Sequence, residues 1–325
     1  MSSRFASGSP PRPSAFSAST AAAAPLSVRA LQSQSWDGGR YTVSSGENVS
    51  VEVSTAYASD PGTGQRWANF FASLVHGSEL GLLRAYVAPI NEVADICGGD
   101  GGVLGCYWND RLVMVGEATY GIQATSVATH EYGHHVAHNR DNAPWSAIDW
   151  GTKRWASSMN ICARVTAGTA FPGDEGGSYT LNPGEAFAES YRVLNETAAG
   201  LPLLWPIVDP SFLPNTSALQ ALREDVVNPW TGPTTQKIRG KFAAHRRTWT
   251  LKLATSLDGD LSVRVAQGSD GLELLGAARN VLARGVLTPF GGKTLHYRIC
   301  GERSLALRVR ASGTAAPFTL RVTQP

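Results

Sequence analysis

The chain contains no long apolar run, and this absence excludes a whole class of proteins. None of its hydrophobic stretches approaches the roughly 20 residues that a helix needs to cross a bilayer, so we expect no membrane span. Its opening, to about Gln34, lacks acidic residues and is rich in Ser, Ala and Pro. The Ala-rich stretch 21–26 also lacks the Leu and Val density of a signal peptide. We therefore expect residues 1–35 to be a disordered or targeting segment.

Cysteine is scarce, with only four in 325 residues. No two have the C-x-x-C spacing of a metal-binding or redox motif. Cys97 and Cys106 bracket a Gly-rich loop that can turn back on itself, which predicts a disulfide between them. For Cys162 and Cys300 two alternatives stay open: a bond between distant parts of the chain, or two unpaired thiols. The even number of cysteines favours an oxidising compartment.

The net charge of +2 is small but unevenly distributed along the chain. From Lys237 onward there are 15 Lys and Arg against 5 Asp and Glu, a net of +10, which leaves −8 for the rest. The basic tail can dock on the acidic body, or it can bind an anionic surface such as a cell-wall polymer. No nucleic-acid-binding motif accompanies the charge, so we expect no nucleic-acid partner.

Histidine is also rare, yet four of the seven lie between His130 and His138. Residues 130–134 read H-E-Y-G-H, an H-E-x-x-H motif. On a helix, His130 and His134 are one turn apart, so both rings leave the same face and can bind one ion. Glu131 points about 100° away and lies beside a water on that ion, where it can act as a base. A solvated polar face is the alternative interpretation of such a cluster.

A zinc peptidase site needs three protein ligands and one open position. The metzincin pattern H-E-x-x-H-x-x-G-x-x-H is excluded, because Ala137 and Arg140 stand where Gly and the last His are required. His138 cannot converge with the other two on a straight helix, so we expect it beside the site or at the surface. Residues 182–183, Asn-Pro, begin another helix, on which acidic residues lie one turn apart on one face.

Those acidic residues are Glu185 and Glu189. An H-E-x-x-H helix followed by a helical Glu resembles the gluzincin, or thermolysin, clan of zinc metallopeptidases. The resemblance implies that Glu185 is the third Zn²⁺ ligand and that Glu189 hydrogen-bonds a ligand histidine. An exchange of the two roles and an ordinary solvated acidic face are the alternatives. Clan members also use a Tyr or His to stabilise the oxyanion, and Tyr179 is the candidate here. The implied substrate is a protein or peptide.

The hydrophobic pattern before and after the motif predicts an α+β fold. Alternation in 41–45 and 49–55 predicts a hairpin, and the aromatic spacing in 67–74 predicts a helix. With strands at 82–87 and 111–115, this gives a small sheet over the H-E-x-x-H helix, followed by a mainly helical second lobe. Zinc peptidases commonly have an edge strand over the metal that pairs with the substrate, and we assign it to Arg111–Glu117.

The last third of the chain changes to a period of two after the Pro and Gly cluster at 228–233. Alternation in stretches such as 249–253 and 318–322 predicts a small β-sandwich. Its size, its place and its F-T-L-R-V ending resemble the pre-peptidase C-terminal domain of secreted bacterial proteases. We therefore expect a peptidase domain at 36–232, a sandwich at 233–325, and secretion.

Two other functions remain open from the sequence. One is a non-catalytic, surface-binding relative whose metal site is structural. The other is a metal-dependent hydrolase that acts on cell-wall peptides. Both keep His130 and His134 as metal ligands, and they differ from a general endopeptidase in whether Glu131 acts and on what substrate.

Overall fold

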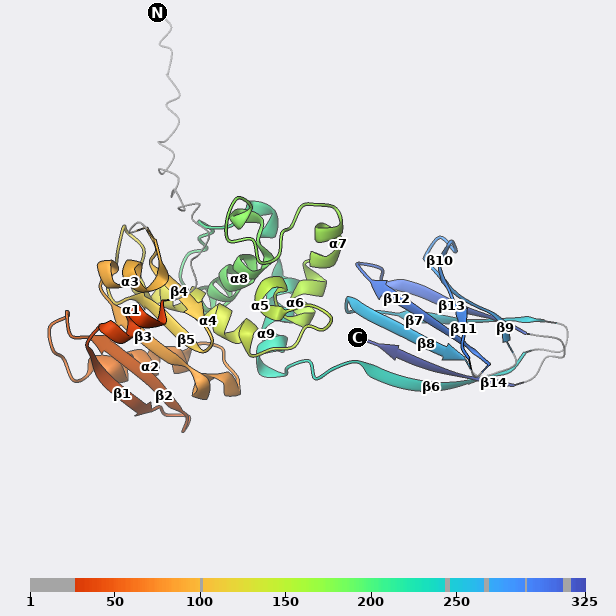
Figure 1. The fold of residues 1–325 in the computed structure, drawn as a ribbon, viewed down its shortest axis with the longest axis horizontal. Coiled ribbons are helices and arrows are strands. Elements are labelled where there is room, and N and C mark those ends of the chain that lie inside the picture. The colour runs from red at the N-terminus through yellow and green to blue at the C-terminus, as the bar shows by residue number, and fades with distance from the viewer. Residues whose placement is uncertain (1–26, 100–101, 243–245, 266–268, 290, 312–316) are drawn as a thin grey trace, which may run out of the picture.

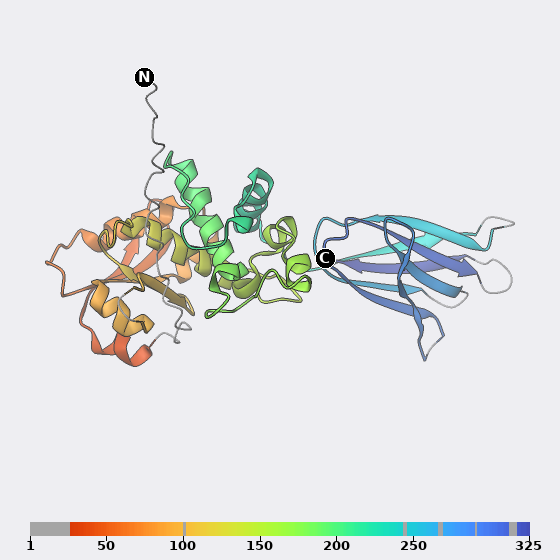
Figure 2. The ribbon, with the colours of Figure 1, turned by 90° about the horizontal axis from the view of Figure 1, so that it is seen from above.

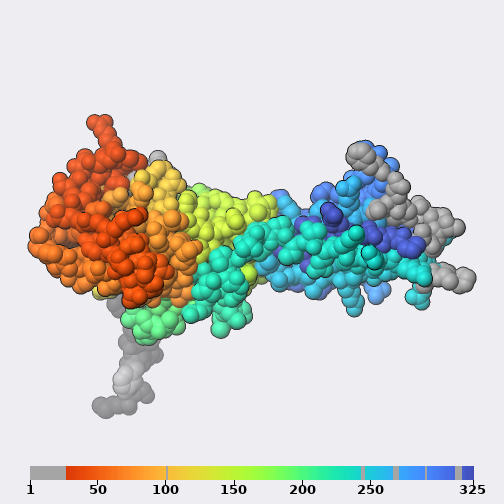
Figure 3. All heavy atoms as spheres, turned by 90° about the horizontal axis from the view of Figure 1, so that it is seen from below, coloured from red at the N-terminus to blue at the C-terminus, as the bar shows by residue number. Residues whose placement is uncertain are grey.

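The computed structural model describes residues 27–99, 102–242, 246–265, 269–289, 291–311 and 317–325. An α+β region with a mixed sheet and helices is followed by a domain of antiparallel sheets, which confirms the predicted fold class. The two regions lie end to end and give the molecule an elongated shape (Figures 1 and 3). The C-terminus lies next to the junction of the two regions (Figure 2).

A five-stranded sheet in the order β1-β2-β3-β5-β4 is the centre of the first region. Its strands are β1 Trp36–Thr42, β2 Asn48–Ser54, β3 Arg84–Ala88, β4 Gly105–Trp108 and β5 Arg111–Val115. The three inner strands are parallel, whereas β1 and β4 are antiparallel edge strands. Residues 112–115 of β5 are all buried, so both faces of the sheet are covered at this strand, as a parallel sheet requires.

The edge strand at this end of the sheet is therefore β4, and the assignment of that role to Arg111–Glu117 is wrong. β5 lies between β3 and β4 and has ladder partners on both sides. β4 was missed because it is only four residues long and begins with Gly105, a residue that strands disfavour. Its outer edge has no ladder partner among the described strands, so an extended segment can pair there.

Helices pack against this sheet and against each other. They are α1 Val28–Ser33, α2 Thr63–Ser73, α3 Ile90–Cys97 and α4 Ala124–His138, with a 3₁₀ turn η1 at Ser78–Leu82. Phe71 of α2 stacks on Tyr132 of α4, with ring centroids 5.8 Å apart. The expected disorder up to residue 35 is wrong for α1, because Ser27 caps it and Leu31 is buried in the core. Residues 1–26 lie outside the described residues.

A helical lobe follows α4. Its elements are α5 Ala147–Trp150, α6 Lys153–Ser158, α7 Ile161–Thr166, α8 Pro183–Ala198 and α9 Thr216–Val227, with 3₁₀ turns η2 Tyr179–Leu181 and η3 Pro210–Phe212. The predicted start of α8 is confirmed, because the Asn182 side chain accepts from the Gly184 N–H and Pro183 occupies the first turn. None of the helices in the described ranges has the length and apolar character that a bilayer crossing requires.

The last domain consists of two sheets with one shared core. One sheet has the order β10-β9-β13-β7, and the other has the order β11-β12-β8-β14-β6. The strands are β6 Thr234–Gly240, β7 Thr248–Ala254, β8 Gly259–Val265, β9 Ser269–Leu275, β10 Val281–Arg284, β11 Val286–Leu287, β12 Lys293–Ile299, β13 Ser304–Ala311 and β14 Phe318–Gln324. Inward-facing aliphatic side chains from both sheets, such as Val263 and Leu307, form a single cluster, which is the arrangement of a β-sandwich.

Two disulfides fasten the chain. Cys97 and Cys106 are joined across the Gly-rich loop, as predicted. Cys162 of α7 is joined to Cys300, which follows β12, so the bridge connects the helical lobe to the sandwich. Beside it, Arg303 donates to the Ser157 carbonyl at 2.7 Å, and the Ser157 hydroxyl accepts from the Asp258 N–H at 2.9 Å. The junction is therefore bonded covalently and by hydrogen bonds.

Candidate metal centre

The site is created by the close approach of α4 and α8. Gly133 faces α8 so tightly that a methyl group added to it would lie 2.8 Å from the Cα of Ala188. A larger residue at position 133 would therefore hold the two backbones apart. With a glycine there, side chains close to this contact on each helix can reach a common point.

At that point His130, His134 and Glu185 bring three metal-binding groups together. The two Nε2 atoms are 3.3 Å apart, and they lie 3.2 Å and 3.3 Å from the Glu185 carboxylate oxygens. Ligand atoms about 2.0–2.1 Å from a tetrahedral zinc ion are roughly 3.3–3.4 Å from one another. The spacing and chemistry of this donor set fit a divalent metal ion.

The electrostatics of the three groups also suit a cation. Burial lowers the pKa of His130, but hydrogen bonds to Glu185 and Glu189 outweigh it and raise that pKa well above its usual value. Burial raises the pKa of Glu185, but the two rings outweigh it and lower that pKa well below the usual value. The carboxylates thus attract positive charge to the rings, and a metal ion can take the place of the ring protons.

Glu189 fixes the orientation of His130 from behind. Its Oε1 accepts from Nδ1 of His130 at 3.0 Å, which leaves Nε2 turned toward Glu185 and His134. Arg192 donates to both oxygens of Glu189, at 3.0 Å and 2.8 Å. The Arg192–Glu189 pair is one that the sequence interpretation overlooked, although the spacing of three residues on one helix was a usable signal.

Glu131 is buried beside the three donors without joining them. Glu131 is 7% exposed, and no hydrogen bond or ion pair links its side chain to any described residue. It lies against β4, because a methyl group on Gly105 would be 2.8 Å from Glu131 Oε1. Burial is the main cause that raises the pKa of Glu131. The site therefore contains an unpaired carboxylate of increased basicity between the donor set and the edge strand.

Tyr179 also reaches the site from the 3₁₀ turn before α8. Its hydroxyl donates to Glu185 Oε2 at 2.7 Å. Burial and the neighbouring Glu185 raise the pKa of Tyr179 well above its usual value, so the hydroxyl keeps its proton at neutral pH. Glu175, which the sequence gave no reason to select, lies in the same environment. Burial and Glu185 raise its pKa to about 7.

The remaining histidines of α4 lie outside the donor set. His135 is fully buried and its Nε2 is bonded to the Glu79 carbonyl at 2.8 Å, and burial lowers its pKa. His138 is exposed at the surface, with its ring centroid 5.8 Å from that of Tyr107. The cluster of four histidines therefore divides into two metal-site candidates, one core residue and one surface residue.

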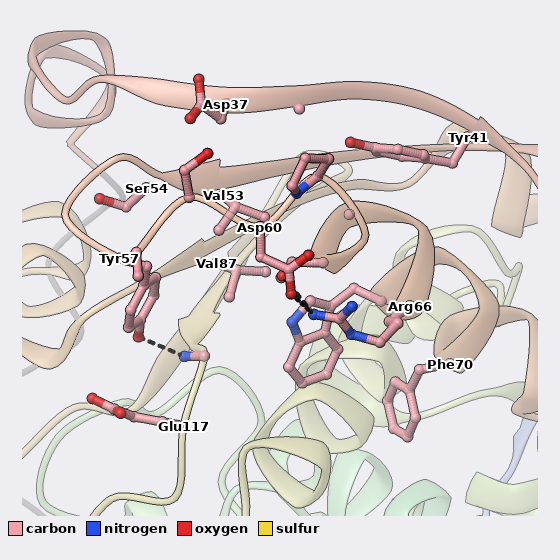
Figure 4. A pocket seen from close by; sticks show the side chains of 18 of the residues that line it. Asp37, Tyr41, Val53, Ser54, Tyr57, Asp60, Arg66, Phe70, Val87 and Glu117 are labelled. Carbon is pink, nitrogen blue, oxygen red and sulfur yellow. Dashed lines mark hydrogen bonds and ion pairs between the residues drawn. The ribbon is translucent and has the colours of Figure 1, made fainter.

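A separate cavity of about 890 Å³ lies elsewhere in the first region. Figure 4 shows Tyr41 and Asp37 on β1 above it, with Tyr57, Arg66 and Phe70 around it. Its lining contains none of His130, His134 and Glu185. The donor chemistry, rather than the size of this cavity, therefore identifies the candidate functional site.

Comparisons with known proteins do not assign the chain to a family. No family model matches it. No curated protein matches it either. Among solved structures, it is similar to the SPBc2 prophage-derived protein YomS, with 11% sequence identity, 28% of this chain and 96% of that chain covered, and a TM-score of 0.20. A likeness this weak carries no argument about fold or function, so the site has to be interpreted from its own residues.

Proposed function

We propose that the chain is a zinc-dependent peptidase of the gluzincin type. The observation that carries this proposal is the meeting of His130, His134 and Glu185 beside a fourth acidic group, Glu131, that is buried but unpaired. A purely structural zinc site has a closed set of four ligands. Three protein donors next to a free carboxylate are the arrangement expected of a hydrolytic site.

The residues have distinct roles in this proposal. A zinc ion held by His130, His134 and Glu185 would supply Lewis-acid chemistry, which makes water acidic and a carbonyl electrophilic near neutral pH. Glu131 accepts the proton of the attacking water and passes it to the leaving amine. Its burial favours this role, because a carboxylate with a raised pKa is a better base.

Tyr179 and β4 complete the proposed site. The Tyr179 hydroxyl remains protonated and is therefore a hydrogen-bond donor for the oxyanion that develops on the substrate. β4 is an edge strand that adjoins Glu131 through Gly105, so an extended peptide that pairs with β4 passes beside the base. This pairing explains why a peptide is the substrate that fits best.

Substitution of Glu131 tests the proposal most directly. We expect Glu131→Gln to lower peptide cleavage about 10²–10⁴-fold, the usual contribution of a general base, while one zinc ion per chain remains in elemental analysis. His134→Ala should lose both zinc and cleavage. Glu117→Gln, an exposed glutamate that lines the separate cavity, is the matched control and should retain both. A Glu131→Gln chain that cleaves casein as fast as the wild type would refute the proposed base.

Secretion is part of the same proposal. Two disulfides in one chain are typical of an oxidising compartment. If the natural substrate is a cell-wall peptide rather than a general protein, the same variants should lose activity on cell-wall fragments while the wild type leaves casein intact. A wild-type chain that binds zinc and cleaves neither substrate would favour the structural-metal alternative.

A further inference from the structure

The second sheet of the sandwich bears a continuous row of side chains across all five of its strands. Residues directly opposite one another on neighbouring strands form this row. In strand order they are Val286 of β11, Thr294 of β12, Arg264 of β8, Arg321 of β14 and Lys237 of β6. Neighbouring strands in a sheet are about 4.8 Å apart. The row therefore places three cations side by side on three adjacent strands of one face.

Arg239 adds a fourth cation two residues beyond Lys237 on β6. All four side chains, Lys237, Arg239, Arg264 and Arg321, are exposed. Within the described residues, none of them has an ion pair or hydrogen bond through its side chain. We call these four residues the basic row. They point away from the sandwich core, because the residues that alternate with them, such as Val263 and Leu320, are buried.

In the opposite sheet, the outward-facing arginines of β13 and β10 contact an acidic side chain. On β13, Arg308 donates to Glu273 of β9 at 2.6 Å and Arg310 donates to the same carboxylate at 3.4 Å. Arg284 of β10 lies 3.5 Å from the other oxygen of Glu273. Three arginines of that face thus share the carboxylate of one buried glutamate. The basic row has no such carboxylate, although both faces belong to one small domain.

An unneutralised row has an energetic cost. Like charges directly opposite each other on adjacent strands repel and destabilise the sheet. Arg321 has a cation opposite it on both sides, Arg264 on one and Lys237 on the other. A role in binding accounts for this arrangement. An anionic ligand that lies over the three cations is attracted to all of them, and its charge offsets the repulsion between them.

The residues around the basic row indicate which anion fits. The next row along the same face consists of Thr235, Thr323, Ser262 and His296, opposite one another in register. The hydroxyls of Thr235 and Thr323 are 2.8 Å apart. The outward-facing residues described on this face include no Phe, Tyr or Trp ring on which nucleic-acid bases could stack. Cations beside hydroxyl groups match a polymer that itself alternates charges and hydroxyls.

We propose that this face of the sandwich binds an acidic polysaccharide, a glycan with carboxylate or sulfate groups. The basic row contacts the charges, and the Thr and Ser row hydrogen-bonds the sugar hydroxyls. This site lies on the sandwich and does not depend on the metal centre. It would hold the peptidase region close to a glycan-rich surface.

Binding of dextran sulfate by the full-length chain tests this site, with uncharged dextran as the reference polymer. We expect binding of dextran sulfate alone, weakening as salt rises above about 0.1 M. Arg264→Gln with Arg321→Gln should lower the affinity about tenfold. The matched control is Lys252→Gln with Arg279→Gln, which removes the same charge from exposed residues outside the basic row and should bind like the wild type.

The remaining outcomes decide between partners. The Arg264 and Arg321 variant should melt at the same or a higher temperature than the wild type, because a like-charge contact is removed. Equal losses in both double variants would overturn the basic row as the site. Binding of duplex DNA, or of phosphatidylglycerol vesicles in contact with the exposed Val286 and Leu287, more tightly than dextran sulfate and through the same arginines would overturn the glycan assignment.

Discussion

The charged side chains of the metal centre are buried and converge on one point, whereas those of the basic row are exposed and lie side by side on a sheet face. His130, Glu185 and Glu189 are each at most 6% exposed and bond to one another. Arg264 and Arg321 of the sandwich are exposed, and neither side chain has an ion pair or hydrogen bond to the part of the chain that the structure describes. The sandwich core beneath them is almost entirely aliphatic and aromatic.

Buried and exposed charges differ in how much the fold loses when one of them is replaced. Replacement of one buried charge destabilises the folded protein, because its former partner is left desolvated and unpaired. Exposed charges act nearly independently, and each can be replaced at little cost to the fold. We therefore expect substitutions in the α+β region to alter metal binding and stability together, and those in the sandwich to alter binding alone.

Glu189→Gln provides the largest test of this coupling. The amide cannot carry the negative charge that orients His130 and balances Arg192, so we expect zinc affinity to fall about 10–100-fold. Isothermal titration with zinc measures the change. Glu196→Gln is the matched control, because Glu196 pairs with the same Arg192 but has no contact with His130. Equal losses in the two variants would show that Arg192, rather than the His130 hydrogen bond, controls the site.

Gly133→Ala tests the close packing that brings the two helices together. Alanine is about 1 kcal/mol better than glycine within a helix, but overpacking costs about 1–3 kcal/mol. Because the atom met is the Ala188 backbone, which cannot move aside, we expect a net loss of about 1 kcal/mol in the free energy of unfolding and weaker zinc binding. Urea unfolding measures the first effect.

Gly81→Ala is the control for the helix pair. A methyl group there meets no atom within 4 Å, so its effect should stay within about 0.5 kcal/mol. A Gly133→Ala chain that is as stable as the wild type and binds zinc equally well would show that α4 and α8 can separate without cost. The proximity of Glu185 to the histidines would then need another explanation.

The parts of the site that could be predicted from sequence are those that a single helix fixes. One turn of helix dictates that His130 and His134 share a face, and Asn182-Pro183 determines where α8 begins and thus where Glu185 points. The meeting of α4 with α8 required the clan resemblance, because no local pattern states which helices pack. The role of Tyr179 in catalysis stays a prediction, although its hydroxyl bonds Glu185.

Features that depend on distant pairing could not be predicted. β4 forms by pairing with β5, and its four residues are too few to show the hydrophobic alternation of a strand. The helical spacing of Trp155, Met159, Cys162 and Thr166 predicts one buried stripe, but the helix is interrupted at Asn160. Asn160 adopts a left-handed conformation with φ 53° between α6 and α7. Cys162 and Cys300 are 138 residues apart, and spacing alone does not determine whether such thiols meet.

Lys153 lies where the two regions meet, and it provides the smallest and most specific test. It is 1% exposed, donates to the Ala143 carbonyl at 2.6 Å and lies 4.5 Å from the centre of the Trp230 ring. Gly259 of β8 leaves room for its ammonium group, because a methyl group there would be 2.8 Å from Nζ. Burial lowers the pKa of Lys153 to about 8, although Asp258 and Asp260 of the sandwich oppose this.

A lowered lysine pKa makes stability rise with pH over a defined window. Between pH 8 and pH 10.5 the unfolded chain holds a proton on this lysine that the folded chain has released, so the free energy of unfolding increases across that range. The difference between wild type and Lys153→Met, measured by urea unfolding at several pH values, should therefore shift in favour of the wild type as pH rises. Lys252→Met, at an exposed site, is the matched control. A difference that stays constant from pH 8 to pH 10.5 would mean that the junction opens enough to hydrate the ammonium group, so that the two regions do not share a buried charge.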